Sequence, residues 1–143
     1  MEIRIIQAPE VISLRHEVLR PNQPIEMCTY PDDQREGTFH LGGIKDGHIV
    51  AVGTFIQRSH ETYPELTYQL RGMATSPAVR GEGYGKALLE EARNRLKAQG
   101  ADGWWCNARL VAVPFYERLG LTVASESFEI EGIGPHHIMV DRF

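Results

Sequence analysis

The sequence predicts an α/β fold of the α+β kind, in which helices cover a mixed, largely antiparallel sheet. Two observations predict it. Runs rich in β-branched and aromatic residues alternate along the chain with stretches whose apolar residues recur at helical spacing. In two places neighbouring β-type runs are joined by a short turn, which only antiparallel strands allow. With 143 residues, of which 42% are hydrophobic, we expect one globular domain over residues 1–143.

The strands are expected where β-type runs stand between turn signals. Asp46-Gly47 is a hairpin signal between the second and third of them, and a turn over residues 132–135 joins the last two. Gly72, inside the fourth strand, indicates a bulge or a close approach of backbone. The expected strands cover residues 3–7, 38–44, 48–57, 66–75, 103–108, 121–131 and 137–143.

The helices are expected where apolar residues recur every three or four positions. One runs over residues 9–20, a longer one over about 83–99 with Gly100 as its C-terminal cap, and a short one over about 111–119. Residues 23–34 are polar and interrupted by proline, which fits either a short helix or a loop over a binding site.

Charge and composition exclude several function classes. The formal net charge of −4 argues against a general affinity for nucleic acid or for anionic membrane surfaces. The first residues lack the pattern of a secretory signal, and no apolar run approaches the length that spans a bilayer. Cys28 and Cys106 lie far apart without metal-ligand spacing, so neither a metal site nor a disulfide framework is indicated. We therefore expect a soluble, cytoplasmic protein.

The strongest local signal is the segment 80–86, Arg-Gly-Glu-Gly-Tyr-Gly-Lys, between the strand that ends at Thr75 and the helix that follows. Glycines at alternate positions remove side chains, so backbone N–H groups can converge on a ligand at the helix N-terminus. Unpaired donors and the helix dipole there favour a phosphate or pyrophosphate. Arg80 and Lys86 add positive charge. A protein with net negative charge can therefore hold a polyanion in one local site.

Two better-known phosphate loops are excluded by spacing. The loop of nucleoside triphosphatases needs glycine where this chain has Arg80, and Ser or Thr where it has Ala87. A dinucleotide-binding turn needs glycine at the position of Lys86 and an upstream strand within a parallel βαβ unit. The remaining pattern is Arg-x-x-Gly-x-Gly between a strand and a helix.

With this pattern the chain resembles the GNAT superfamily of acyl-CoA-dependent N-acetyltransferases, over nearly its whole length. The resemblance implies a mostly antiparallel sheet of about seven strands flanked by about four helices, with a splay between the fourth and fifth strands. The matching segments are 70–75 as the cofactor strand, 80–86 as the pyrophosphate loop, Asn107 on the next strand, and 115–121 as a helix and turn. Residues Leu14, Arg15, His40, Gly134, Pro135, His136 and Met139 further resemble the small bacterial ElaA-like group.

The resemblance implies that acetyl-CoA is the cosubstrate and that no metal takes part. Backbone groups of residues 73–75 would pair with the pantetheine arm, and Asn107 would face that arm from the fifth strand. Glu82 and Tyr84 hold variable positions of the motif and would contribute backbone N–H groups. The implied cofactor-binding residues are Met73, Ala74, Thr75, Arg80, Gly81, Glu82, Gly83, Tyr84, Gly85, Lys86, Asn107, Phe115 and Tyr116.

The implied reaction is direct attack of a primary amine on the thioester of acetyl-CoA. An amine with a pKa of about 10 is protonated at neutral pH, so a base must remove its proton. The candidate bases are His136, His40 and Glu36. The backbone N–H of Met73 can stabilise charge on the thioester carbonyl, and Tyr116 can protonate the departing thiolate. We expect the catalytic residues among Tyr116, His136 and His40.

Each assignment has a structural alternative. Tyr116 can simply pack beside Phe115, Asn107 can be a hydrogen-bonded polar group at a strand end, and both histidines can be structural. The whole protein can also be a catalytically inactive member of the fold that binds acyl-CoA as a sensor. The other alternative for the whole protein is a structural domain whose glycine loop binds nothing.

The acceptor is left open between a small-molecule amine and a peptide amine. Its pocket is expected to be built from residues 15–33, 59–64 and 130–137. The fold permits a homodimer, which the sequence does not decide. Acidic residues in the first of these segments and beyond it either attract a cationic amine or form a solvated loop; they are Glu26, Asp32, Asp33 and Glu36.

Overall fold

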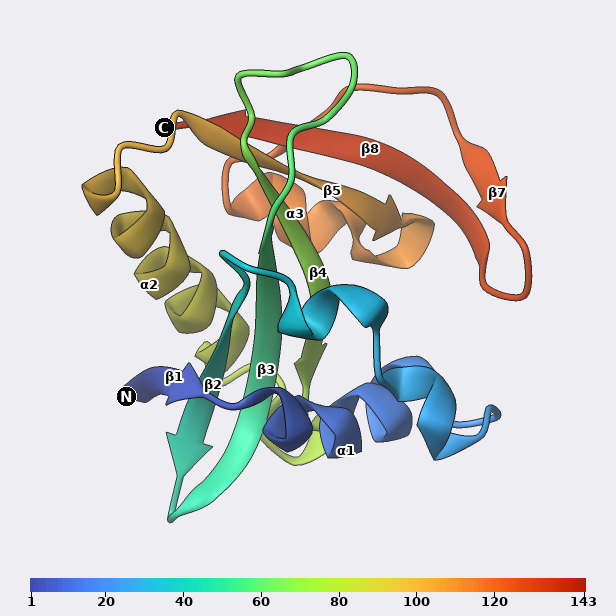
Figure 1. Ribbon diagram of the computed structural model, residues 1–143. Coiled ribbons are helices and arrows are strands. Elements are labelled where there is room, and N and C mark those ends of the chain that lie inside the picture. The colour runs from blue at the N-terminus through green and yellow to red at the C-terminus, as the bar shows by residue number, and fades with distance from the viewer.

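The computed structural model describes all residues, 1–143, and shows an eight-stranded sheet in the order β1-β2-β3-β4-β5-β8-β6, with β7 paired to β8 (Figure 1). Neighbouring strands run antiparallel except β4 and β5, which run parallel. This is the mixed, mostly antiparallel sheet that the sequence predicts. The strands are β1 (Glu2–Ile6), β2 (Phe39–Lys45), β3 (His48–Gln57), β4 (Tyr68–Thr75), β5 (Gly103–Arg109), β6 (Thr122–Val123), β7 (Phe128–Ile130) and β8 (Gly134–Arg142).

The helical segments are one long helix and a set of short turns. The α-helices are α1 (Ile12–Leu14), α2 (Tyr84–Ala98) and α3 (Val113–Arg118). No helix combines the length and apolar character that crossing a membrane requires. The 3-10 turns are η1 (Ala8–Val11), η3 (Ile25–Cys28), η4 (Pro31–Gln34), η5 (Pro77–Val79) and η6 (Leu110–Ala112), and η2 (Arg15–Leu19) is a π-helical turn.

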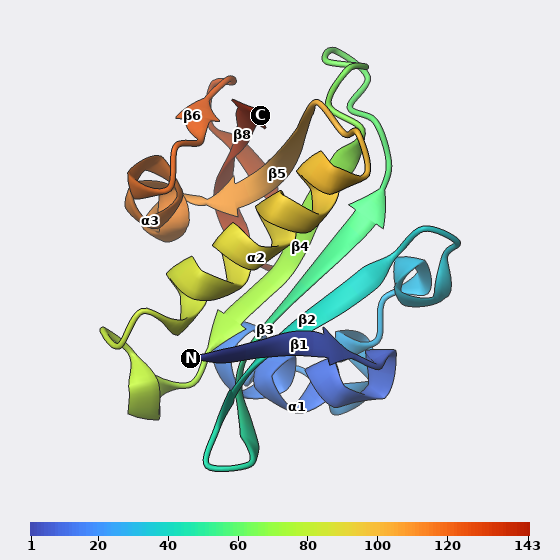
Figure 2. The same cartoon turned by 90° about the vertical axis from the view of Figure 1, so that its left-hand side faces the viewer.

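Helical segments cover both faces of the sheet, and the alternation of side chains along β3 shows how. Ala51 and Phe55 belong to the large core cluster that also contains the apolar face of α2. Val52, one position along, belongs to a smaller cluster with Val11 and Leu14 of the N-terminal helical segments. Because successive strand residues point to opposite faces, α2 lies on one face and the N-terminal segments lie on the other, as Figure 2 shows.

Two expected elements are divided in the structure. The strand expected over residues 121–131 is split into β6 and β7, because the Ser125 hydroxyl accepts the Ile138 N–H at 2.8 Å in place of a neighbouring strand carbonyl. The helix expected over residues 9–20 consists of η1, α1 and η2 in succession. Its end widens into a π turn that is closed by the Arg20 N–H on the Arg15 carbonyl at 3.1 Å.

Strands β4 and β5 separate soon after they meet. Only the pairs Tyr68–Trp104 and Gln69–Trp105 join them, although β4 continues to Thr75 and β5 to Arg109. Beyond Gln69 the edge of β4 that would face β5 carries no strand partner, and Figure 1 shows the two strands diverging. The splay between the fourth and fifth strands, which the resemblance implied, is therefore present, and it leaves backbone donors and acceptors of β4 available to a ligand.

A β-bulge redirects β4 inside the splay, as Gly72 indicated. Gly72 and Met73 together lie opposite Gly53 of β3, so β4 carries one extra residue there. Gly72 has a φ of +65°, which side chains rarely tolerate. A Cβ at this position would also lie 2.9 Å from Nε of Arg15, which packs beneath the strand. The bulge thus depends on glycine for two separate reasons.

A fully buried ion pair ties the polar segment 23–34 to the sheet. Arg15 donates to both carboxylate oxygens of Asp33 at 2.8 Å, to the Cys28 carbonyl at 2.8 Å and to the Thr54 hydroxyl at 2.7 Å. The backbone N–H of Tyr30 donates to the same carboxylate at 2.9 Å. A guanidinium with this many partners is well placed for burial, because these acceptors replace the water that burial removes.

Loss of the Asp33 charge is expected to destabilise the fold strongly. The variant Asp33→Asn leaves the Arg15 guanidinium buried without its counter-charge, and we expect a loss of about 3–5 kcal/mol in the free energy of unfolding. Urea denaturation of the purified variant measures it. The matched control is Glu65→Gln, which removes the partner of Arg142 in an exposed ion pair and should change stability little. Equal effects of the two variants would contradict the account.

Candidate active site

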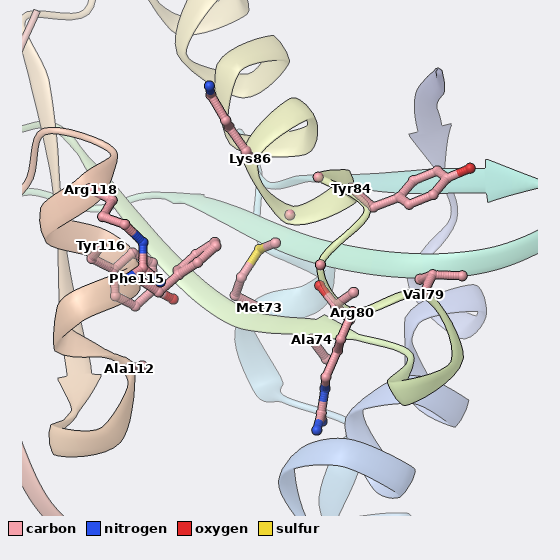
Figure 3. Close-up of a pocket in the computed structure, with 14 residues that line it drawn as sticks. Met73, Ala74, Val79, Arg80, Tyr84, Lys86, Ala112, Phe115, Tyr116 and Arg118 are labelled. Carbon is pink, nitrogen blue, oxygen red and sulfur yellow. The ribbon is translucent and has the colours of Figure 1, made fainter.

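The splay opens into a cavity of about 480 Å³ between β4, the N-terminus of α2, and α3 (Figure 3). Met73 and Phe115 approach it from opposite sides, and Arg80 and Lys86 stand at its glycine-rich side. We call it the first cavity. It is lined by Met73, Ala74, Thr75, Val79, Arg80, Gly81, Gly83, Tyr84, Gly85, Lys86, Ala112, Phe115, Tyr116 and Arg118.

The N-terminus of α2 presents unpaired backbone donors to this cavity. Gly83 is the N-cap with a φ of 90° and supplies no side-chain cap, and the first intrahelical bond runs from the Ala87 N–H to the Gly83 carbonyl at 3.0 Å. The N–H groups of Tyr84, Gly85 and Lys86 therefore have no acceptor within the chain. These donors and the positive end of a 15-residue helix dipole favour an anion.

Three cations line the same cavity and balance a polyanion. Arg80 and Arg118 are exposed and make no ion pair. Lys86 meets only Glu90, at 3.9 Å and in solvent, which leaves its ammonium free to turn toward a ligand. Gly85 brings the helix close to Phe115, because a Cβ there would lie 3.1 Å from the ring and 3.4 Å from the Thr75 hydroxyl. The site therefore fits an anionic ligand that lies against the start of α2.

All residues that the resemblance implied for cofactor binding line the first cavity except Glu82 and Asn107. The carboxylate of Glu82 accepts from Nζ of Lys45 at 2.7 Å on the protein surface. Tyr84 is among the residues that line the cavity, but Figure 3 shows its ring directed away from Met73 and Phe115. The ring packs on β2, where a Cβ on Gly43 would lie 3.0 Å from it. For Tyr84 only the backbone is placed to serve a ligand in this cavity. The backbone N–H of Glu82 donates to the Val79 carbonyl at 3.1 Å, so Glu82 does not supply the free donor that the resemblance implied.

A second cavity, of about 350 Å³, lies on the other side of the splay. It is bounded by β4 and β5, by the segment around η2 and Tyr30, and by the β7–β8 turn. Asn107 lines this cavity and not the first one. The second cavity is lined by Leu19, Arg20, Tyr30, Gln69, Leu70, Arg71, Cys106, Asn107, Arg109, Tyr116, Ile130, Ile133 and His136.

Tyr116 is the one residue that lines both cavities. Its side chain is buried, and burial raises the pKa of its phenol far above the ordinary value, with a smaller contribution from Cys106 in the same direction. Burial also raises the pKa of the Cys106 thiol, to about 12. Both groups stay protonated at neutral pH. Tyr116 is thus a hydroxyl donor at the junction of the two cavities, whereas Cys106 is poorly suited to act as a nucleophile.

His136 is the histidine that faces the second cavity. Its Nδ1 lies 2.8 Å from the Gly134 carbonyl, which can only accept a hydrogen bond, so Nδ1 carries the proton. In the neutral ring the lone pair is then on Nε2, which has no partner within the chain. The ring stacks on Phe128 with centroids 6.1 Å apart. This geometry suits a group that accepts a proton.

His40 has a different environment and lines neither cavity. Its Nε2 donates to the Asp33 carbonyl at 3.1 Å, and its Nδ1 accepts from the Thr54 hydroxyl at 2.8 Å, which in turn accepts from Arg15. Burial lowers the pKa of the His40 imidazole below its ordinary value of 6.5. A neutral ring with both nitrogens engaged is a structural group and offers no free lone pair to a substrate. Glu36 is exposed and lines neither cavity.

The acceptor segments named from the sequence are partly brought together. Residues of 15–33 and of 130–137 line the second cavity. The loop 59–64 does not, because His60 packs against Trp105 with centroids 4.8 Å apart and Nε1 of Trp105 donates to the Arg58 carbonyl at 2.9 Å. The loop is thereby held against Trp105 and lines neither cavity.

Sequence reasoning missed several cavity residues. Arg118 stands one helical turn after Phe115, so the spacing of a helix beside the glycine-rich loop could have identified it. Arg20 follows η2, Arg71 lies on β4 and Arg109 ends β5, and the three converge only in the folded chain. No local pattern signals that convergence.

Comparison with known proteins decides the family. A model of the Acetyltransferase (GNAT) family matches residues 8–121. The chain belongs to this family. A curated relative described as the uncharacterized N-acetyltransferase YitI of Bacillus subtilis (strain 168) is 38% identical over 140 residues, which cover 97% of this chain and 94% of the relative. The predicted membership of the GNAT superfamily is confirmed.

Solved structures agree on the fold. Escherichia coli ElaA superposes with a TM-score of 0.79 at 20% identity, covering 98% of this chain and 99% of ElaA. An aminoglycoside 6'-N-acetyltransferase complexed with coenzyme A gives a TM-score of 0.73 at 13% identity, covering 99% of this chain and 97% of that enzyme. At these identities the likeness shows the GNAT fold alone.

The buried state of His40 predicts a pH dependence of stability. Because its pKa is lower in the folded than in the unfolded chain, the unfolded chain binds a proton first as pH falls. Stability is therefore complete above the unfolded pKa and decreases as pH drops below about 6.5. Thermal unfolding between pH 7.5 and 5.5 measures this slope. It should be smaller in His40→Gln, and an unchanged slope in that variant would contradict the assignment.

Proposed function

We propose that this protein transfers an acetyl group from acetyl-CoA to a primary amine by direct attack. The observation that carries the proposal is the pair of cavities that meet at Tyr116. The first presents unpaired helix amides and three cations beside a free strand edge, and the second presents an imidazole with an unpaired Nε2. The confirmed family supports an acyl-CoA donor, and one solved structure of the same fold is a complex with coenzyme A.

In the first cavity the chain offers two kinds of group to the donor. The N–H groups at the start of α2, with Arg80 and Lys86, would hold the diphosphate. The unpaired edge of β4 beyond Gln69 would take the pantetheine arm as a substitute for β5. Asn107 lines the second cavity, so in this proposal it serves the acceptor side of the splay.

Acetyl-CoA supplies a thioester carbonyl that an amine can attack. The N–H of Met73, in the bulge of β4, would donate to the carbonyl oxygen as negative charge develops there. His136 would accept the amine proton on Nε2, directly or through a water. Tyr116, kept protonated by burial, would donate its proton to the departing sulfur. Holding amine and thioester on either side of Tyr116 would supply further rate through orientation.

Coenzyme A is expected to raise the melting temperature of the protein. At a hundredfold excess over Kd the stabilisation is about 2.7 kcal/mol, which corresponds to several degrees for a chain of this size. In the double variant Arg80→Gln/Lys86→Gln we expect about tenfold more coenzyme A to be needed, because two charges that face the diphosphate are lost.

The matched control for this experiment is Arg95→Gln/Lys97→Gln, at the other end of α2, which changes the net charge equally. If both double variants bound coenzyme A alike, or if coenzyme A left the wild type unchanged, the proposed donor site would be refuted. Binding without release of free thiol from acetyl-CoA over an amine panel would instead favour the sensor alternative.

Removal of the Tyr116 hydroxyl should impair turnover and spare donor binding. We expect Tyr116→Phe to reduce kcat by roughly 10²–10⁴-fold, the range for loss of a positioned acid, while the thermal shift with coenzyme A persists. Release of free thiol measures kcat. The control is Tyr68→Phe, whose buried hydroxyl donates to Gln99 at 3.1 Å and lines neither cavity. A normal kcat in Tyr116→Phe would exclude the acid role.

A further inference from the structure

The second cavity is electropositive in a protein of net negative charge. Three of its lining residues are arginines, Arg20, Arg71 and Arg109, and none is an aspartate or a glutamate. The whole chain carries a formal charge of −4. Charges of one sign that line a concave site focus their field into it. The lining is therefore positively charged although the whole molecule is negatively charged, and it favours a negatively charged ligand group.

The arginines are only partly satisfied by the protein. Arg109 donates to the Leu19 carbonyl at 2.9 Å, and Arg20 donates to the amide oxygen of Gln23 at 3.1 Å. Neither partner is charged. The Nε of Arg20 is buried without a hydrogen-bond partner. A buried donor without an acceptor costs free energy. Because Arg20 and Arg109 have only uncharged partners within the chain, the lining of this cavity carries unbalanced positive charge.

Arg71 is the central member of the three, because it lies on β4 at the splay, directly before the Gly72 bulge. The nearest carboxylate, that of Asp32, is 3.9 Å away and accepts a shorter bond of 2.7 Å from Arg58. The guanidinium carbon lies 4.0 Å from the centroid of the Tyr30 ring, which holds its plane in place. Desolvation lowers the pKa of Arg71, because removal of water destabilises its charged form. A bound anion would stabilise that charged form.

The acidic residues named from the sequence do not reverse this field. Asp33 is buried in its bidentate pair with Arg15, and Asp32 is paired with Arg58. Glu26 and Glu36 are exposed and line neither cavity. The four acidic side chains are thus either paired with Arg15 or Arg58 or exposed to solvent. A polycationic acceptor would find no carboxylate in the cavity.

We propose that the acceptor is a small amine that also carries an oxyanion group, a carboxylate or a phosphate, which Arg71 binds together with Arg20 and Arg109. The inference rests on the proposed function and names the substrate class of the same site. The volume of about 350 Å³ suits a small molecule. The oxyanion lies against the arginines, and the amine lies toward His136 and Tyr116, which line the same cavity.

The test compares matched acceptors that differ only in the anionic group. Alanine and phenylalanine are each paired with their amides, glutamate is paired with its diamide, phosphoethanolamine is paired with ethanolamine, and spermidine represents polycations. Binding to the protein saturated with coenzyme A is measured by calorimetry, and turnover of acetyl-CoA by release of free thiol. We expect at least one anionic member to bind about tenfold to a hundredfold more tightly than its neutral partner. Whether the preferred acceptor is an amino acid or phosphoethanolamine shows whether the cavity recognises a carboxylate or a phosphate.

Variants of Arg71 connect the preference to the cavity. Arg71→Gln should abolish the preference for the anionic partner and leave binding of the neutral partner and of coenzyme A unchanged, and Arg71→Lys should restore part of it. Arg142→Gln, which removes an exposed arginine paired with Glu65, should keep the full preference. A preference that survives in Arg71→Gln would overturn the proposal.

The two proposals fail in different ways. Tighter binding of spermidine or of the neutral partners than of every anionic member would overturn the inference about the acceptor, whether or not thiol is released. Absence of thiol release with every amine, together with selective binding of an anionic member that depends on Arg71, would contradict the proposed acetyl transfer and support the inference about the cavity.

Discussion

The early end of the pairing between β4 and β5 is the constraint on which the rest of this structure depends. Two pairs of residues hold these parallel strands together, and beyond them the chain leaves the edge of β4 open. An open strand edge in the middle of a sheet costs hydrogen bonds unless something replaces them. In this protein the gap is lined on one side by the start of α2 and by α3, and on the other by the N-terminal segments and the β7–β8 turn. Both cavities follow from that gap.

Helix α2 and the buried Arg15–Asp33 ion pair fix the positions of the segments on either side of the gap between β4 and β5. On one face α2 packs its apolar side against β3 and β4 and brings its unpaired N–H groups to the first cavity. On the other face Arg15 fixes the segment 23–34 and passes close beneath Gly72. Tyr30, whose N–H donates to the Asp33 carboxylate, is thereby held against Arg71. The hydrogen bonds between Arg15, Asp33 and Tyr30 thus position one wall of the second cavity. Of these three residues only Tyr30 lines the cavity itself.

Local signals were sufficient where one segment of chain determines the outcome. The Asp46-Gly47 hairpin, the bulge at Gly72 and the glycine-rich start of α2 each follow from residues that are adjacent in sequence. The resemblance to the GNAT superfamily supplied the splay, which no local pattern encodes. His136 and Tyr116 were named as candidates, and the structure brings them to one cavity.

Interactions between distant segments were beyond sequence reasoning. Nothing near His40 reveals that Thr54 and the Asp33 carbonyl occupy both of its nitrogens, and nothing near Glu82 reveals Lys45. The single strand expected over residues 121–131 is divided because Ser125 competes for a backbone N–H of a strand that comes later in the chain. The electropositive second cavity depends on three arginines from three distant segments of the chain, and only the fold places them together.

The central claim is that the gap beside β4 and the start of α2 bind the acyl donor. A titration with coenzyme A, followed by backbone amide signals in nuclear magnetic resonance, tests it most directly. The account predicts that the largest shifts fall on the N–H groups of Met73, Thr75, Gly83, Gly85 and Lys86, which line the first cavity. Signals that move elsewhere on the sheet, or that do not move at all, would contradict it.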